Sequence, residues 1–183
     1  LAEDLAYAFA QQEIIVMLHH AGNEDVVYAS PKGFPAPGFG ENLENFVEKE
    51  KRRKSAINQS SPLASPSKLN FIAAANYDQH IDKLRECDLV IEAIAERMDW
   101  KSGLYKKVAP YLGERTIFAS NTSGLSINQL AQAFPEHLRH RFCGIHFFNP
   151  PRYMHLVELI GTQSTDGSTL DALETWLTSR LGK

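Results

Sequence analysis

Three side chains in the second half of the chain have types suited to proton transfer. Ser123 follows one short apolar segment, His146 ends another, and Glu158 lies within a third. A histidine can accept a proton near neutral pH because its ordinary pKa is about 6.5. Glu158, twelve residues further on, could hold the ring N–H and stabilise the imidazolium. This trio is the main indication in the sequence that the protein is an enzyme.

Each member of the trio also has a purely structural interpretation. Ser123 or Ser126 could cap the helix that follows, because serine accepts hydrogen bonds from free helix N–H groups. His146 could bond a backbone carbonyl, and Glu158 could be an edge carboxylate in water. The residues beside Glu158, within 156–160, are apolar, and a charge in such a run needs a partner. This favours a pair between Glu158 and His146.

A regular alternation of predicted strands and helices positions these residues. The predicted strands are 70–73, 88–91, 116–119, 142–146 and 156–160, and the predicted helices are 77–86, 101–112, 126–134 and 170–181. Such alternation indicates a parallel sheet with helices on both faces. The last two strands are joined by a connection too short for a helical crossover, so we expect them to be antiparallel. Ser120 to Ser123 then lie at the carboxyl end of a parallel strand, where open α/β sheets bind ligands.

The first third of the chain is less regular. Ile14 to Leu18 predict a buried helix that Gly22 ends, and residues 25–29 predict a strand. Residues 31–41 contain three prolines and three glycines and predict a loop. A mixed-charge helix at 41–57 and a second loop at 58–67 follow. We expect one domain over residues 1–183, with a diverged part at 1–67.

Composition excludes several classes of protein. The chain has 183 residues, 43% of them hydrophobic, and a net charge of −3, which suits one α/β domain and gives no positive field for nucleic acid or an anionic membrane. No segment approaches a membrane span, and the start lacks the order of a secretory signal. We expect a cytoplasmic protein without nucleic-acid or membrane partners.

Metal and disulfide chemistry are not indicated either. Cys87 and Cys143 have no CxxC spacing and are expected to be buried as small hydrophobes. His137, His140 and His146 could supply metal ligands, but spacing fixes no third ligand, so we expect no metal. The basic run at 49–54 is typical of a solvated helix face, with a phosphate contact as its functional alternative.

Longer motifs in the same half of the chain resemble the 3-hydroxyacyl-CoA dehydrogenase family. The matching segments, in chain order, are Asp88 to Glu96, Ser120-Asn121-Thr122-Ser123, His146-Phe147-Phe148-Asn149-Pro150 and Leu156 to Ile160. They cover roughly residues 70–182, and ordered motifs of this length are more specific than a lone glycine fingerprint. The resemblance implies a doubly wound, Rossmann-like NAD-binding domain of the α/β class, with an antiparallel strand pair near its C-terminus.

The resemblance also implies a reaction. NAD would accept hydride from C3 of a (3S)-3-hydroxyacyl-CoA while His146 takes the hydroxyl proton, giving a 3-ketoacyl-CoA in fatty-acid β-oxidation. Glu158 would orient His146, and Ser123 matches the family serine that hydrogen-bonds the reacting oxygen. The cofactor would be bound by residues that match positions lining the NAD site. These are Ala93, Glu96, Lys101 and Asn149.

Two departures from the family pattern lie near the start. Members begin with a strand and a GxGxxG turn that binds the pyrophosphate, but Tyr7 to Gln12, where that turn should fall, contain no glycine. Ser30 stands where an acidic residue should bind the ribose hydroxyls. The alternative function is therefore a non-catalytic, diverged or truncated acyl-CoA or nucleotide-binding module that no longer binds NAD productively.

A third departure concerns the other end. After Lys183 the family continues into a mainly helical domain that supplies a further catalytic asparagine and much of the dimer contact. We therefore expect a homodimer in the full-length protein, and a weak or inactive domain in isolation. Leu1 is not an initiator methionine, which favours a piece of a longer protein over a natural remnant.

Overall fold

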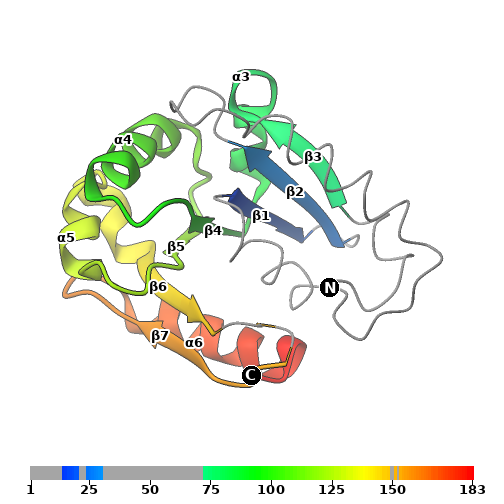
Figure 1. Cartoon of the computed structure of the whole chain (residues 1–183), viewed down its shortest axis with the longest axis vertical. Helices are drawn as coiled ribbons and strands as arrows, with labels where there is room; N and C mark the ends of the chain where they lie inside the picture. The colour runs from blue at the N-terminus through cyan, green and yellow to red at the C-terminus, as the bar shows by residue number, and fades with distance from the viewer. Residues whose placement is uncertain (1–13, 21–23, 31–71, 149–150, 152) are drawn as a thin grey trace.

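A mixed β-sheet organises the domain (Figure 1). The computed structural model describes residues 14–20, 24–30, 72–148, 151 and 153–183, and within them the strand order is β3-β2-β1-β4-β5-β6-β7. The strands are β1 (Ile14–His20), β2 (Glu24–Ser30), β3 (Ile72–Asn76), β4 (Leu89–Ala93), β5 (Ile117–Ser120), β6 (Phe142–Phe147) and β7 (Val157–Ile160).

Most strands of this sheet point the same way. β2 is parallel to β3, and β4, β5 and β6 are parallel to one another. β1 is antiparallel to both of its neighbours, β2 and β4. The strands β2 to β6 therefore share one direction, and β1 runs opposite to them. β7 is antiparallel to β6, which confirms the predicted C-terminal pair. The carboxyl ends of β4, β5 and β6 therefore meet at one edge.

Helical segments lie at the four predicted places, and one further short segment precedes β6. They are α3 (Tyr77–His80) with η3 (Ile81–Glu86), α4 (Met98–Val108) with η4 (Ala109–Tyr111), α5 (Ile127–Gln132), η5 (Glu136–Arg141), and α6 (Gly167–Trp176) with η6 (Leu177–Leu181). The last segment ends at Gly182, whose φ of 66° is left-handed and favours glycine. In the described part of the chain, no helix combines the length and apolar character needed to cross a membrane.

Helices cover both faces of the sheet, as predicted. Val90 and Phe118 pack with residues of α4 and α5 in one buried cluster, whereas Ile91 and Ala119 pack with residues of α6 in another. Successive strand residues point to opposite faces, so this alternation places α4 and α5 on one side and α6 on the other (Figure 1). The sheet is doubly wound.

Aromatic packing fills the face that α4 and α5 cover. The ring centroid of Phe118 lies 5.3 Å from that of Tyr105 and 4.8 Å from that of Phe134, and Phe134 lies 5.1 Å from Phe142. All four side chains are at most 2% exposed. Their tilted and edge-to-face contacts stabilise the core beyond the area they bury, and they fix Tyr105 beneath the end of β4.

The predicted helix at Ile14 to Leu18 is wrong, because Ile14–His20 form β1. The run is short, and it begins with three β-branched residues, which favour strands. A short apolar run does not distinguish a buried helix from a buried strand, and here β2 and β4 supply hydrogen-bonding partners on both sides. The predicted strand at 25–29 is confirmed as β2. The segments predicted at 31–41, 41–57 and 58–67 lie outside the described residues.

Candidate active site

The carboxyl ends of three parallel strands bring the candidate residues to one edge of the sheet. Glu92 of β4 pairs in register with Ser120 of β5, which pairs with Gly144 of β6. Asn121 then links all three strands: its backbone N–H donates to the Glu92 carbonyl at 2.7 Å, and its Oδ1 accepts from the N–H of Phe147 at 2.9 Å. The strand ends are thereby held in fixed relative positions.

His146 and Glu158 form the pair expected from the sequence. They face each other in the register of β6 and β7, with His146 Nδ1 2.7 Å from Glu158 Oε2. The His146 side chain is 17% exposed and that of Glu158 is 51% exposed. A carboxylate at Nδ1 favours the tautomer with the proton on that nitrogen, which leaves Nε2 free to act as a base. The His146 ring also packs 4.6 Å from the Phe148 ring, centroid to centroid.

The apolar residues beside Glu158 do not bury its carboxylate. Leu156 is 57% exposed and Ile160 is 36% exposed, because β7 is an edge strand in the described sheet and only part of it is covered. Glu158 therefore pairs with His146 while remaining half in water.

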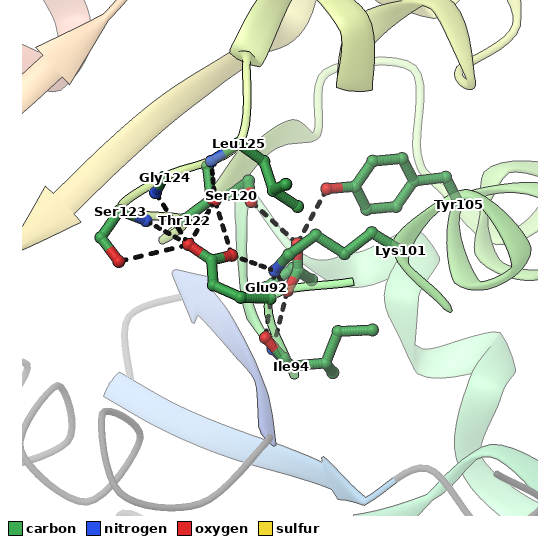
Figure 2. A network of polar contacts seen from close by, with 10 residues as sticks. Glu92, Ile94, Lys101, Tyr105, Ser120, Thr122, Ser123, Gly124 and Leu125 are labelled. Atoms are coloured by element: carbon green, nitrogen blue, oxygen red, sulfur yellow. Dashed lines mark hydrogen bonds and ion pairs between the residues drawn. The ribbon is translucent and has the colours of Figure 1, made fainter. Parts of the chain in front are cut away.

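Ser123 lies in a turn whose residues bond the Glu96 carboxylate, and Figure 2 shows Thr122, Ser123 and Gly124 of this turn. Glu96 Oε1 accepts from the backbone N–H groups of Ser123 at 2.6 Å and Gly124 at 2.9 Å, and the Thr122 hydroxyl lies 2.7 Å from both carboxylate oxygens. The Ser123 hydroxyl donates to the same oxygen at 3.2 Å, a long distance for a bond between two oxygens. The backbone of the turn is thus held firmly and the Ser123 hydroxyl loosely.

These donors keep Glu96 ionised. Partial burial acts to raise the pKa of its carboxyl group, but hydrogen bonds from Thr122, Gly124 and Ser123, together with the positive charge of Lys101, outweigh burial and lower the pKa below its ordinary value. The side chain is 42% exposed. Glu96 therefore presents a charged, accessible acceptor at the edge where the parallel strands end.

A second, buried network surrounds the Glu92 carboxylate (Figure 2). Glu92 is 0% exposed and Lys101 is 1% exposed. Glu92 Oε1 accepts from Lys101 Nζ at 2.5 Å, while Oε2 accepts from the hydroxyls of Tyr105 at 2.8 Å and Ser120 at 2.9 Å. Lys101 Nζ is also 3.9 Å from Glu96 Oε2. Burial, followed by the charge of Glu92, raises the pKa of Tyr105 well above its ordinary value, so Tyr105 stays a hydrogen-bond donor.

The structure brings the predicted residues together in two groups. Glu96, Lys101 and Ser123 form one, and His146 and Glu158 form the other. In the described part of the chain no hydrogen bond joins the side chains of Ser123 and His146, and the link between the groups runs through Asn121, as described above.

The remaining predicted residues have separate positions. Ala93 is partly buried at the end of β4, and Asn149 lies outside the described residues. Ser126 caps α5, because its side chain accepts from the Gln129 N–H at 3.4 Å. Ser123 is therefore not needed as the cap.

Sequence reasoning gave Glu92, Asn121 and Tyr105 no individual role. A signal for Glu92 was present, since its carboxylate directly follows Leu89-Val90-Ile91 in the chain and a charge in such a strand needs a partner. Nothing local marks Tyr105 or Asn121, because their contacts join segments that are distant in the sequence.

Neither cysteines nor metal ligands form a reactive cluster among the described residues. Cys87 and Cys143 are free and buried, as predicted. Burial raises the pKa of both thiols to about 12, which makes them unreactive. Where side chains are described, no three His, Cys, Asp or Glu groups are arranged to hold a metal ion.

Comparison with known proteins identifies the family of this chain. Residues 1–183 match the family model described as 3-hydroxyacyl-CoA dehydrogenase, NAD binding domain. The chain is 46% identical over 123 residues to a putative fatty acid oxidation complex trifunctional enzyme of Rickettsia prowazekii, covering 67% of this chain and 17% of that protein. It is 36% identical over 150 residues to the mitochondrial hydroxyacyl-coenzyme A dehydrogenase of Sus scrofa, covering 82% of this chain and 44% of that protein.

A solved structure supports the same relationship. The (S)-3-hydroxybutyryl-CoA dehydrogenase of Ralstonia eutropha is 35% identical and superimposes with a TM-score of 0.58, covering 79% of this chain and 46% of that one. The chain thus spans less than half the length of each of these relatives.

Proposed function

The chain belongs to the 3-hydroxyacyl-CoA dehydrogenase family as its NAD-binding domain, and from this premise we propose the reaction of the whole protein. It oxidises a (3S)-3-hydroxyacyl-CoA to a 3-ketoacyl-CoA in fatty-acid β-oxidation. The observation that carries the proposal is the contact between His146 and Glu158 at the edge where the parallel strands end. Alcohol oxidation needs a proton acceptor of this kind beside the carbon that loses hydride.

NAD is the cofactor that the matched domain indicates, and the described residues suit it. Glu96 offers an ionised, partly exposed carboxylate at the ends of the parallel strands, where open α/β sheets bind their ligands. Ala93 has a side chain too small to obstruct the backbone there. Asn149 completes the proposed set. When bound, NAD supplies the hydride acceptor.

The chain's own residues perform the proton chemistry in this proposal. His146 Nε2 takes the hydroxyl proton from the substrate, and Glu158, bound at Nδ1, stabilises the resulting imidazolium. Ser123 donates its hydroxyl hydrogen to the reacting oxygen. The bond from the Ser123 hydroxyl to Glu96 is 3.2 Å long and therefore weak. Little free energy is lost when this hydroxyl bonds the substrate oxygen in place of Glu96.

The experiment uses the full-length protein that contains this chain. NADH binding is first measured by nicotinamide fluorescence, and NADH oxidation is then followed with acetoacetyl-CoA as substrate. We expect His146→Ala to lower turnover by about 10²-fold or more, since a general base contributes that much. His137→Ala, at an exposed histidine of η5, is the matched control and should retain turnover. Equal turnover of the two variants would remove His146 as the base.

A second candidate function rests on the direction of β1. In dinucleotide-binding sheets the first strand leads at its carboxyl end into the pyrophosphate-binding turn. Here Ile14, the first residue of β1, pairs with Ala93, so β1 begins at the edge where β4 ends. This orientation and the lack of glycine in Tyr7 to Gln12 favour a module that binds acyl-CoA or a nucleotide without turnover. Folded full-length protein that fails to bind NADH at millimolar concentration would support this alternative and refute the first.

The proposal also includes two properties of the whole protein. These are a homodimer, which rests on the family resemblance, and a cytoplasmic location. Light scattering of the full-length protein and cell fractionation test them, and a monomer or a membrane-pelleting protein would contradict them.

A further inference from the structure

The segment between β4 and α4 is held from its buried side at a single residue. The backbone N–H of Ile94 donates to Glu92 Oε1 at 2.7 Å, and the carbonyl of Ile94 accepts from Lys101 Nζ at 3.1 Å. The Glu92–Lys101 ion pair thus closes a ring through both polar groups of one peptide segment (Figure 2). Glu96 lies two residues further along the same segment, and its carboxylate accepts a hydrogen bond from the backbone N–H of Ser123.

This ion pair is more elaborate than stability requires. Both oxygens of Glu92 are satisfied, with Lys101 and Ile94 at one and Tyr105 and Ser120 at the other. A buried pair of charges is commonly no more stabilising than apolar residues of similar volume. A specific advantage of charges here is geometric, because their hydrogen bonds fix the course of the backbone that leads to Glu96.

Lys101 also links the buried and the exposed networks. Its Nζ lies 2.5 Å from Glu92 Oε1 and 3.9 Å from Glu96 Oε2. With the side chain 1% exposed, the ammonium group is enclosed by its protein partners. Through Glu96 and Ile94, Lys101 therefore reaches the edge where the parallel strands end.

We propose that Lys101 and Glu92 are positioning residues, which set the 94–96 segment so that Glu96 holds the Ser123 turn in its reactive place. This inference deepens the proposed function and rests on it for its catalytic consequence. In this proposal Lys101 supports the 94–96 segment and does not contact the cofactor, whereas the family resemblance suggested a residue that lines the cofactor site. Ser123, at the end of this chain of contacts, is the group that touches substrate.

The test compares two variants of the full-length protein that each remove one bond to Glu92. Lys101→Met removes the ammonium group that bonds the Ile94 carbonyl. Tyr105→Phe removes a hydroxyl whose bond goes to Glu92 Oε2, the oxygen that does not bond the 94–96 segment. Hydrogen exchange of the backbone amides of Ser123 and Gly124 reports directly on their bonds to Glu96. Steady-state kinetics give kcat and KM with acetoacetyl-CoA and NADH.

The proposal predicts a difference between the two variants. In Lys101→Met, the amides of Ser123 and Gly124 exchange about tenfold faster or more. The reason is that the bond from the charged ammonium group to the Ile94 carbonyl is lost, which loosens the segment that carries Glu96. In the same variant kcat falls about tenfold or more while the KM for acetoacetyl-CoA changes by less than about threefold, because misplacement of a reacting group acts on the transition state. In Tyr105→Phe, exchange and kcat stay within about twofold. Equal effects of the two variants, or no effect of Lys101→Met, would overturn the proposal.

A double variant keeps the test valid if Lys101→Met does not fold. Glu92→Gln/Lys101→Met contains no unpaired buried charge and retains an amide oxygen that can accept from the Ile94 N–H, but it lacks the ammonium bond to the Ile94 carbonyl. The same increases in exchange and loss of kcat are expected. The exchange measurement needs no turnover, so wild-type protein without dehydrogenase activity would refute the proposed reaction, and unchanged exchange would refute the positioning role.

Discussion

Replacing Glu92 with glutamine should destabilise the domain strongly. The substitution keeps the size of a side chain that is 0% exposed but removes its charge, 2.5 Å from Lys101 Nζ. The Lys101 ammonium group, 1% exposed, would then have as partners only the Ile94 carbonyl oxygen and the Glu96 carboxylate, which is 3.9 Å away. Breaking a buried pair in this way costs about 3–5 kcal/mol. For a domain of this size each kcal/mol lowers Tm by about 2–4 °C, so Glu92→Gln should lower it by roughly 6–20 °C.

The Glu92→Gln/Lys101→Met double variant separates a lost ion pair from lost packing. With both charges removed, no buried ion is left uncompensated, and we expect more than half of the lost stability to return. The coupling free energy in the double-mutant cycle should therefore be about 2 kcal/mol or more. Calorimetry of the full-length protein, with the transition of this domain followed in each variant, measures it.

An exposed ion pair at the start of α4 provides the matched control. Arg97 and Asp99 are 2.7 Å apart with side chains 56% and 64% exposed, so solvent screens their interaction. Asp99→Asn should leave Tm unchanged. The reasoning is refuted if Glu92→Gln also leaves Tm unchanged, or if the effects of Glu92→Gln and Lys101→Met simply add.

Three further predictions follow from single groups. Because the folded-state pKa of Glu96 is lowered from its ordinary value of 4.5, its contribution to stability is complete above that value and is lost as pH falls below it. The free energy of unfolding should therefore fall more steeply with decreasing pH in wild type than in Glu96→Gln, and the two should converge at low pH. Gly113→Ala should destabilise the domain by about 1–3 kcal/mol, since its Cβ would lie 2.5 Å from the Arg85 carbonyl oxygen, whereas Gly167→Ala, with open space, should not, by urea unfolding. The two buried cysteines, with pKa values of about 12, should react with a thiol reagent only after denaturation.

The regular half of the fold could be predicted because local and tertiary preferences agree there. Short apolar strands alternate with helical segments from β3 onward, and the short link between β6 and β7 left an antiparallel pair as the simple solution. Ile14–His20 could not be assigned in the same way. Its residues fit a buried helix or a buried strand, and the hydrogen bonds that β2 and β4 offer decide for the strand.

The site could be predicted where residues are close in the chain or in register, and less well elsewhere. His146 and Glu158 face each other across an antiparallel pair, so the strand assignment alone brings them together. A carboxylate in an apolar run needs a partner most where it is buried, and Glu92 is fully buried whereas Glu158 is half exposed. The partners of Glu92 come from α4 and β5, and no local spacing reveals them.

The most direct test of the proposed function is turnover by the full-length protein with saturating NADH and acetoacetyl-CoA, measured for wild type and for His146→Ala. The His146–Glu158 contact of 2.7 Å predicts that wild type oxidises NADH. The variant should bind NADH equally well, but its turnover should be lower by about 10²-fold or more. Folded wild-type protein that binds NADH without oxidising it, or a variant as active as wild type, would contradict the assignment of this site.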